Sequence, residues 1–506
     1  MYIIIVSLIL YIMGKGKDNY RCNKEFGECE LDILRGSVDE AEKKMAERNI
    51  TPEMENMIKI VEKFLKDNKL VCYGGTAINN ILPLEDQFYD RTLEMPDYDF
   101  YSGNALEDAK KLSDIYVKAG YSEVEAKVSS FHAGTYKVYV NFIPVADISQ
   151  MDSRLFKAIL RDSIKIDNIS YAPPNFLRMG MYLELSRPAG DVSRWEKILK
   201  RLILLNKNYP LRAEDCNNQD VQRKVLQFTE DEYSRIFNIT RDTFTNLGLV
   251  FLGGYANMLY SSYMPKHLRK KVKDIPDFDL LSNNPEKSCT ILKERLTDAG
   301  FKNIKIKKHS GIGEIIASHY EVAVGKETIA FVYKPLACHS YNVITINNKK
   351  TRVATIDTML SFYLAFYYGD KPYYDKDRIM CMSTALFKVQ QKNRLSQRGL
   401  LNRFSIICYG RQETIDDVRA HKSEKFKELN ELSSTEKEKH PDFLKYFFKY
   451  NPTEKKNKSG DKKSKKNKKK KGGTRTSKAG TRKAGTRKAG TRKAGTRKAG
   501  TRRRRR

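Results

Sequence analysis

Residues Val71 to Ser102 read VCYGGTAINNILPLEDQFYDRTLEMPDYDFYS. A short apolar run leads into a glycine pair, where the absence of a side chain lets backbone amides approach an anion closely. In a strand, Asp97 and Asp99 project from one face, roughly 6.6 Å apart along the chain. Phosphate contacts on one side and carboxylates for divalent cations on the other indicate a nucleoside triphosphate site. Its candidate phosphate-binding residues, the last of which adds a hydroxyl at the start of an expected helix, are Gly74, Gly75 and Thr76.

A third acid follows on a predicted neighbouring strand. Gly134 to Phe142 alternates apolar and polar side chains as a half-buried strand does, and leads into the run Val145 to Ser149, which contains Asp147. A carboxylate among apolar residues is costly to bury unless it is paired, hydrogen-bonded or metal-bound. Structural alternatives remain open: a plain turn for the glycine pair, a solvated strand edge for the acid pair, and a turn residue for Asp147.

Together these features resemble the polymerase-beta-like nucleotidyltransferase superfamily. The segments GGTAIN, LP and PDYDFYS are similar, more narrowly, to the poly(A) polymerase catalytic subunits of large nucleocytoplasmic DNA viruses of the giant-virus type. The resemblance covers Thr51 to Gln391 and implies an α/β fold with a mixed sheet. The chain departs from the wider superfamily in the long stretch from Ala77 to Pro96, between the glycines and the acid pair, which leaves the triphosphate geometry open.

The resemblance implies template-independent polyadenylation of RNA 3′ ends, with AMP transferred from ATP to a 3′-hydroxyl and pyrophosphate released. The residues implied as catalytic, and as ligands of two Mg²⁺ or Mn²⁺ ions, are Asp97, Asp99 and Asp147. Fold-level analogy does not choose among the substrates that such an acid triad serves. A CCA-adding type of nucleotidyltransferase and a non-catalytic RNA-binding scaffold therefore remain alternatives. RNA 3′ ends and ATP are the expected partners, and a homodimer or a processivity subunit is left open.

The chain also repeats itself. LVFLGGYANM at residues 249–258 echoes LVCYGGTAIN at residues 70–79, and IPDFDLLS at 275–282 echoes MPDYDFYS at 95–102. We therefore expect two tandem nucleotidyltransferase-like domains. Aligning the segment that contains Asp147 with KPLACHS at 334–340 places Cys338 at the position of the third acid, and Tyr255 replaces Thr76. A neutral thiol is a poor ligand for hard Mg²⁺, so the second copy is predicted to be degenerate.

A chain of 506 residues predicts two or three domains. The expected divisions are an N-terminal extension at 1–45, a catalytic domain at 46–210, a degenerate domain with a helical C-terminal part at 211–450, and a disordered Lys/Arg-rich tail at 451–506. Residues 454–506 hold 26 Lys and Arg against two acids, and therefore carry 24 of the 32 net positive charges. Such a tail is expected to bind RNA or DNA phosphates. A localisation signal or a solubility device is the alternative.

Other features of the sequence bear on the redox state, membrane association and solvent exposure of the protein. Eight scattered cysteines without a C-x-x-C pair predict reduced thiols and a cytoplasmic setting, which includes a viral factory or virion if the protein is viral. The apolar start, Met1 to Met13, is shorter than the ~20 residues of a spanning helix, so no stable membrane association is expected. The basic residues of the predicted helix Val192 to Leu205, which include Lys197 and Arg201, are interpreted as a solvated face and left out of the active site.

Overall fold

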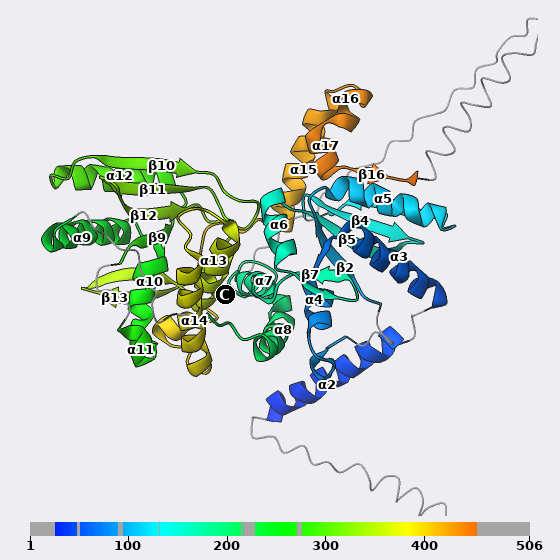
Figure 1. Cartoon of the computed structure of the whole chain (residues 1–506), viewed down its shortest axis with the longest axis horizontal. Helices are drawn as coiled ribbons and strands as arrows, with labels where there is room; N and C mark the ends of the chain where they lie inside the picture. Colours follow the sequence, from blue (N-terminus) through cyan, green and yellow to red (C-terminus); the bar gives the residue numbers. More distant parts are fainter. Residues whose placement is uncertain are drawn as a thin grey trace, which may run out of the picture. The chain divides into compact units, whose positions relative to one another are not determined.

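The computed structural model describes residues 26–47, 51–89, 95–130, 132–213, 216, 228–270 and 276–452. Within these ranges the strands form two eight-stranded mixed sheets, each flanked by helices (Figure 1). This arrangement confirms the expected α/β fold with two tandem mixed-sheet units. The predicted disorder of the basic tail beyond Pro452 and the expected extension Met1 to Met13 lie outside the described residues.

The first sheet has the strand order β16-β3-β4-β5-β2-β1-β7-β6. β2 runs parallel to β5 and β1 runs parallel to β7, whereas the other neighbouring strands are antiparallel. The bounds are β1 Val71–Tyr73, β2 Tyr98–Ser102, β3 Val124–Val128, β4 Thr135–Val140, β5 Ile143–Gln150, β6 Ile164–Ile166, β7 Ile169–Tyr171 and β16 Lys449–Tyr450.

Seven helices of the described chain accompany this sheet. They are α2 Phe26–Glu47, α3 Pro52–Asn68, α4 Gly74–Ile81, α5 Ala105–Lys118, α6 Ser153–Arg161, α7 Pro174–Leu185 and α8 Trp195–Asn208. Helix α3 begins where Thr51 accepts a hydrogen bond from the backbone N–H of Met54 at 3.3 Å, a typical N-cap. Its buried face supplies Val61 and Phe64 to the core, so the helix is held against the sheet by apolar burial.

The second sheet has the order β10-β11-β12-β9-β8-β14-β13-β15. Its strands are β8 Val250–Leu252, β9 Phe278–Leu281, β10 Ile304–His309, β11 His319–Val324, β12 Glu327–Tyr333, β13 His339–Ile346, β14 Lys349–Ala354 and β15 Cys408–Tyr409. The accompanying helices are α9 Glu230–Asn246, α10 Gly253–Tyr260, α11 Lys266–Arg269, α12 Pro285–Asp298, α13 Ile356–Gly369 and α14 Lys376–Lys392.

The two sheets repeat one topology. Taken in chain order, β1 to β7 and β8 to β14 occupy corresponding places in their sheets, and each glycine pair opens an eight-residue helix, α4 or α10. The predicted alignment of the third acid is nevertheless wrong. Asp147 on β5 pairs in register with Asp99, and the residue that pairs with Asp279 on the corresponding strand β12 is Phe331. Cys338 follows β12 and precedes β13, so it is not the counterpart of Asp147.

The last described part of the chain returns to the first sheet. Helices α15 Ile415–Asn430, α16 Ser434–Lys439 and α17 Pro441–Tyr446 lead into β16, which pairs with β3. The backbone N–H of Val128 donates to the carbonyl of Phe448 at 3.1 Å, and the Tyr450 hydroxyl donates to Asp114 at 2.8 Å. This pairing covers an edge of the first sheet. The domain limits read from the sequence stay a prediction.

The two sheet units also contact one another directly. Helix α7 packs against α13, and the Tyr182 hydroxyl donates to the side-chain oxygen of Gln390 at 3.1 Å. The backbone N–H of Ser340 donates to the carbonyl of Ser186 at 2.8 Å. Buried residues of both units form one continuous hydrophobic cluster, so α7 and α13 share a core.

The prediction of reduced thiols is wrong for the structure, which forms disulfides between Cys216 and Cys381 and between Cys338 and Cys408. These partners lie 165 and 70 residues apart, so only the fold brings them together. Cys72 and Cys289 are buried free thiols. None of the described helices has the length and apolar character needed to cross a membrane.

Candidate active site

The three predicted acids meet at one end of the parallel pair β2 and β5. Asp99 on β2 is the register partner of Asp147 on β5, and Asp97 lies immediately before β2. Register partners on neighbouring strands carry their side chains on the same face, about 4.8 Å apart at the backbone. Tyr98 and Phe100 point to the buried face, which leaves Asp99 on the half-buried one. The sequence prediction that these carboxylates converge is thus supported by the register.

The carboxylates strongly affect one another. Burial raises the pKa of Asp99 to about 8, helped by the negative charges of Asp97 and Asp147, while Lys137 and Arg194 partly offset the rise. Withdrawal from water and the charge of Asp147 also raise the pKa of Asp97, although part of its side chain is exposed. Like charges held this closely favour a protonated acid or a bound cation.

A lysine that the sequence interpretation missed pairs with the third acid. Lys137 on β4 lies opposite Asp147 on β5, and its Nζ donates to Asp147 Oδ2 at 2.5 Å. The two side chains are 33% and 15% exposed, so the pair is partly shielded from water. Among the residues that the structure describes, no three His, Cys, Asp or Glu side chains are positioned together as a metal site. The ammonium of Lys137 therefore occupies the position beside Asp147 where the sequence analysis predicts a divalent metal ion.

The glycine turn fits tightly around this site. Gly74 has φ +75°, and a Cβ there would lie 2.5 Å from Asp99 Oδ2. A Cβ on Gly75 would instead lie 2.8 Å from the Tyr89 hydroxyl and 2.9 Å from Arg201 Nη1. The positive φ and the close carboxylate favour glycine at Gly74, whereas a side chain at Gly75 would displace the ends of the Tyr89 and Arg201 side chains.

Thr76 has a definite structural role. Its side chain is buried, and its hydroxyl donates to the backbone carbonyl of Asp97 at 2.7 Å. This bond ties the start of α4 to the segment that carries the acid pair. A contact between Thr76 and nucleotide stays a prediction.

Arg201 is the second residue that the sequence interpretation missed. The interpretation of Arg201 as part of a solvated face is wrong, because the side chain is only 8% exposed. Its guanidinium lies over the rings of Phe88 and Tyr89, with centroid distances of 5.0 and 5.4 Å, and donates to the Tyr89 hydroxyl. The helical spacing of Lys197, Lys200 and Arg201 suggested that all three lie on one solvent-exposed face. The loop that covers it comes from the long stretch before the acids, and no local pattern reveals that contact.

The same turn in the second copy has a different environment. A Cβ on Gly254, the counterpart of Gly75, would lie 2.5 Å from Asp277 Oδ1. Asp277 and Asp279 are 6% and 8% exposed, and the strand next to Asp279 offers Phe331 rather than an acid. The second copy thus lacks the third acid, and Tyr255 stands in place of Thr76, so the structure supports a degenerate second copy.

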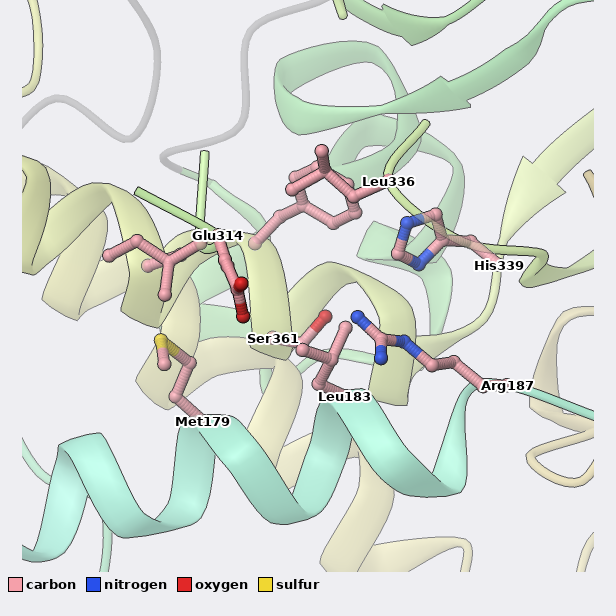
Figure 2. Close-up of a pocket in the computed structure, with 10 residues that line it drawn as sticks. Met179, Leu183, Arg187, Glu314, Leu336, His339 and Ser361 are labelled. Atoms are coloured by element: carbon pink, nitrogen blue, oxygen red, sulfur yellow. The ribbon is translucent and has the colours of Figure 1, made fainter. Parts of the chain in front are cut away.

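A separate cavity lies between α7 and the second unit. It is small, with a volume of about 20 Å³, is partly open to solvent, and is lined by residues that include Arg187, Glu314 and His339. Figure 2 shows the side chains of these three residues directed toward a common space beside Ser361. None of the three carboxylates at β2 and β5 lines this cavity, so it is a different place from the candidate active site.

The segment that carries the candidate site is similar to known proteins. Residues 59–191 match the family model of the poly(A) polymerase catalytic subunit. A protein named as a poly(A) polymerase catalytic subunit in African swine fever virus (isolate Pig/Kenya/KEN-50/1950) is 34% identical over 165 residues, which are 31% of this chain and 34% of that protein. The corresponding protein of Acanthamoeba polyphaga mimivirus is 33% identical over 165 residues, 31% of this chain and 27% of its own length. The chain spans about a third of the length of these curated relatives.

A solved structure supports the fold over a larger part of the chain. The crystal structure of the Megavirus polyadenylate synthase superposes with a TM-score of 0.67 at 20% identity, covering 86% of this chain and 92% of the Megavirus protein. At that identity the likeness establishes the fold. The matched segment 59–191 contains the glycine turn and all three carboxylates. Residues 59–191 are therefore similar in sequence to the poly(A) polymerase catalytic subunit family.

Proposed function

We propose that this protein is a template-independent polynucleotide adenylyltransferase that transfers AMP from ATP to the 3′-hydroxyl of RNA and releases pyrophosphate. The observation that carries the proposal is the register of Asp99 with Asp147, next to Asp97 and the glycine turn. This arrangement lies inside the segment that matches the poly(A) polymerase catalytic subunit model. The names of the African swine fever virus and mimivirus relatives support RNA 3′ ends and ATP as substrates.

The donor set fits two divalent cations of the Mg²⁺ or Mn²⁺ type. Asp97, Asp99 and Asp147 offer only carboxylate oxygens, which these hard ions prefer. Burial and the acidic neighbours raise the pKa of Asp99, so a cation bound beside this carboxylate would stabilise its ionised form. When bound, such ions neutralise phosphate charge and activate the attacking hydroxyl.

The glycine turn and Thr76 position the acid pair and leave space for the triphosphate. Gly74 leaves space for the carboxylate of Asp99, and the hydroxyl of Thr76 fixes the backbone of Asp97. The first N–H groups of α4, which begins at Gly74, have no partners within the helix and favour an anion such as a triphosphate. Asp147 must exchange Lys137 for a cation before all three acids act together.

Primer extension by the purified full chain tests the function. With labelled RNA, Mg²⁺ and one nucleotide at a time, we expect long products with ATP and little extension with CTP, GTP or UTP. Incorporation of CTP followed by ATP, with short products, would support a CCA-adding enzyme instead. RNA binding without extension under any nucleotide would favour the scaffold alternative and contradict the proposal.

Lys137→Met is expected to strengthen binding of divalent cations. The substitution removes the ammonium that competes for Asp147, and a partly exposed pair of this kind is worth about 1 kcal/mol, or roughly fivefold in affinity. Titration of Mn²⁺ by electron paramagnetic resonance measures the change without relying on catalysis. Lys127→Met on β3, where Lys127 pairs with Glu125 at 3.1 Å, is the control, and equal affinities in all three proteins would argue against competition.

Partners beyond the substrates are also proposals. The description of the relatives as catalytic subunits supports a partner subunit, and a homodimer is the other arrangement expected from the sequence. Cytoplasmic location, in a viral factory or a virion, likewise remains a proposal. Sedimentation of the purified chain with and without RNA distinguishes a dimer from a monomer.

A further inference from the structure

Arg201 is a buried cation that forms no salt bridge with an acid among the residues that the structure describes. Its side chain, on α8, is 8% exposed. Lys200, the neighbouring residue, is 63% exposed and pairs with Glu196 at 3.3 Å. The charge of Arg201 partly offsets the rise that burial causes in the pKa of Glu184, but the salt bridge of Glu184 is with Arg194, at 3.2 Å. A buried guanidinium that lacks a salt bridge of its own is costly, so such a group is commonly retained to bind an anion.

The surrounding loop holds Arg201 in place. Asn79 on α4 accepts hydrogen bonds from the backbone N–H groups of Phe88 and Tyr89, both at 2.8 Å. Asp86 accepts from Lys207 of α8 at 2.7 Å, which fastens the same loop to the helix that carries Arg201. The aromatic rings of the loop then cover one face of the guanidinium. These contacts pre-organise the cation at low entropic cost on binding.

The position of Arg201 relative to the acids suggests what it binds. Asp99 lies against Gly74 and Arg201 lies against Gly75, so negative and positive groups flank adjacent residues of one turn. No ion pair joins Asp99 and Arg201 in the described structure, although both adjoin this turn. A polyphosphate lying along the turn would meet the carboxylate-bound cations at one end and the guanidinium at the other. The second copy lacks this arrangement, since Asp277 adjoins its turn.

We propose that Arg201 binds the triphosphate of the incoming nucleotide and that the Tyr89 hydroxyl, which accepts from Arg201 in this structure, occupies the place of a phosphate oxygen until the nucleotide enters. The inference rests on the proposed function, because it names a residue that recognises the substrate of the same site. Guanidinium groups bind phosphate oxygens through two parallel hydrogen bonds, which gives geometric selectivity as well as charge.

The test compares Arg201→Met, Arg201→Lys and the control Lys200→Met in the full chain. Arg201→Met keeps an apolar stem under the aromatic rings, and we expect the KM for ATP to rise by roughly 10- to 100-fold with a smaller change in kcat. Arg201→Lys keeps the charge but loses the paired hydrogen bonds, and should lie between Arg201→Met and the wild type. Lys200→Met should stay within about twofold of the wild type, because Lys200 is exposed.

Binding of inorganic triphosphate by calorimetry, with Mg²⁺ present, provides the readout that does not depend on catalysis. We expect Arg201→Met to weaken this binding by a factor similar to its effect on KM, and thermal unfolding should confirm that the variant is folded. If Arg201→Met does not fold, Arg201→Lys carries the same comparison. Unchanged triphosphate affinity in a folded Arg201 variant overturns the inference. A wild-type chain that binds triphosphate through Arg201 but extends no primer would refute the proposed function and leave this inference standing.

Discussion

Asp99→Asn is expected to reduce primer extension by about 10³-fold or more, because it removes a carboxylate that would hold the catalytic cations and each factor of ten requires only ~1.4 kcal/mol of transition-state stabilisation. The same change should raise the melting temperature of the metal-free protein by a few degrees. Asp99 is a half-buried acid beside Asp97 and Asp147, so its neutral replacement relieves repulsion. Primer extension and thermal unfolding in the presence of a chelator measure the two effects.

The stabilisation should depend on pH in a defined direction. The folded-state pKa of Asp99 is raised to about 8, above its ordinary value near 3.9, so ionisation of this acid opposes folding as pH rises through that range. The gain from Asp99→Asn is therefore expected to be larger at pH 9 than at pH 5. Asp279→Asn, at the corresponding position of the second copy, is the control and should leave extension unchanged. Retained extension in Asp99→Asn, or an equal loss in Asp279→Asn, would contradict the assignment.

Gly74→Ala is expected to reduce extension by about 10²-fold, since displacing a catalytic group by about 1 Å costs this much. Two effects combine at this residue: a φ of +75°, which L side chains rarely adopt, and a Cβ that would lie 2.5 Å from Asp99 Oδ2. Either the carboxylate or the turn must move. The kcat for extension with saturating ATP and primer, measured beside the free energy of unfolding, reports the change.

Gly120→Ala separates backbone strain from the clash with Asp99. Gly120 has φ +103° at the end of α5, and no atom lies within 4 Å of a Cβ built there. This control should therefore lose stability, by about 1 kcal/mol, but keep wild-type kcat. If Gly74→Ala lowered stability as Gly120→Ala does and left kcat intact, the close approach of Gly74 to Asp99 would have no catalytic significance.

The sequence was sufficient for the features that depend on local pattern. The glycine pair, the acids one residue apart and the alternation from Gly134 to Phe142 predicted strands and a helix that the structure confirms, with β2 starting at Tyr98. Asp147 was assigned by its position on a predicted neighbouring strand, and the register of β5 with β2 places it beside Asp99. The repeated glycine and acid blocks likewise predicted the second sheet.

Features that depend on contacts between distant segments could not be predicted. Lys137 belongs to an alternating strand pattern, but only the β4–β5 register shows that it faces Asp147. Arg201 fits a basic helix face until the loop of Phe88 and Tyr89 covers it. Phe331 was missed as the counterpart of Asp147 because the residues around Cys338 resemble those around Asp147 and gave an incorrect alignment. Only the pairing of β12 with β9 shows that Phe331 lies opposite Asp279.

Anomalous diffraction from crystals of the full chain grown with Mn²⁺ and a non-hydrolysable ATP analogue tests whether the three carboxylates hold the catalytic cations. We expect Mn²⁺ peaks within about 2.0–2.6 Å of carboxylate oxygens of Asp97, Asp99 and Asp147, with Lys137 moved away from Asp147. Peaks confined to other parts of the protein, with the bond between Lys137 and Asp147 intact and nucleotide bound, would contradict this prediction.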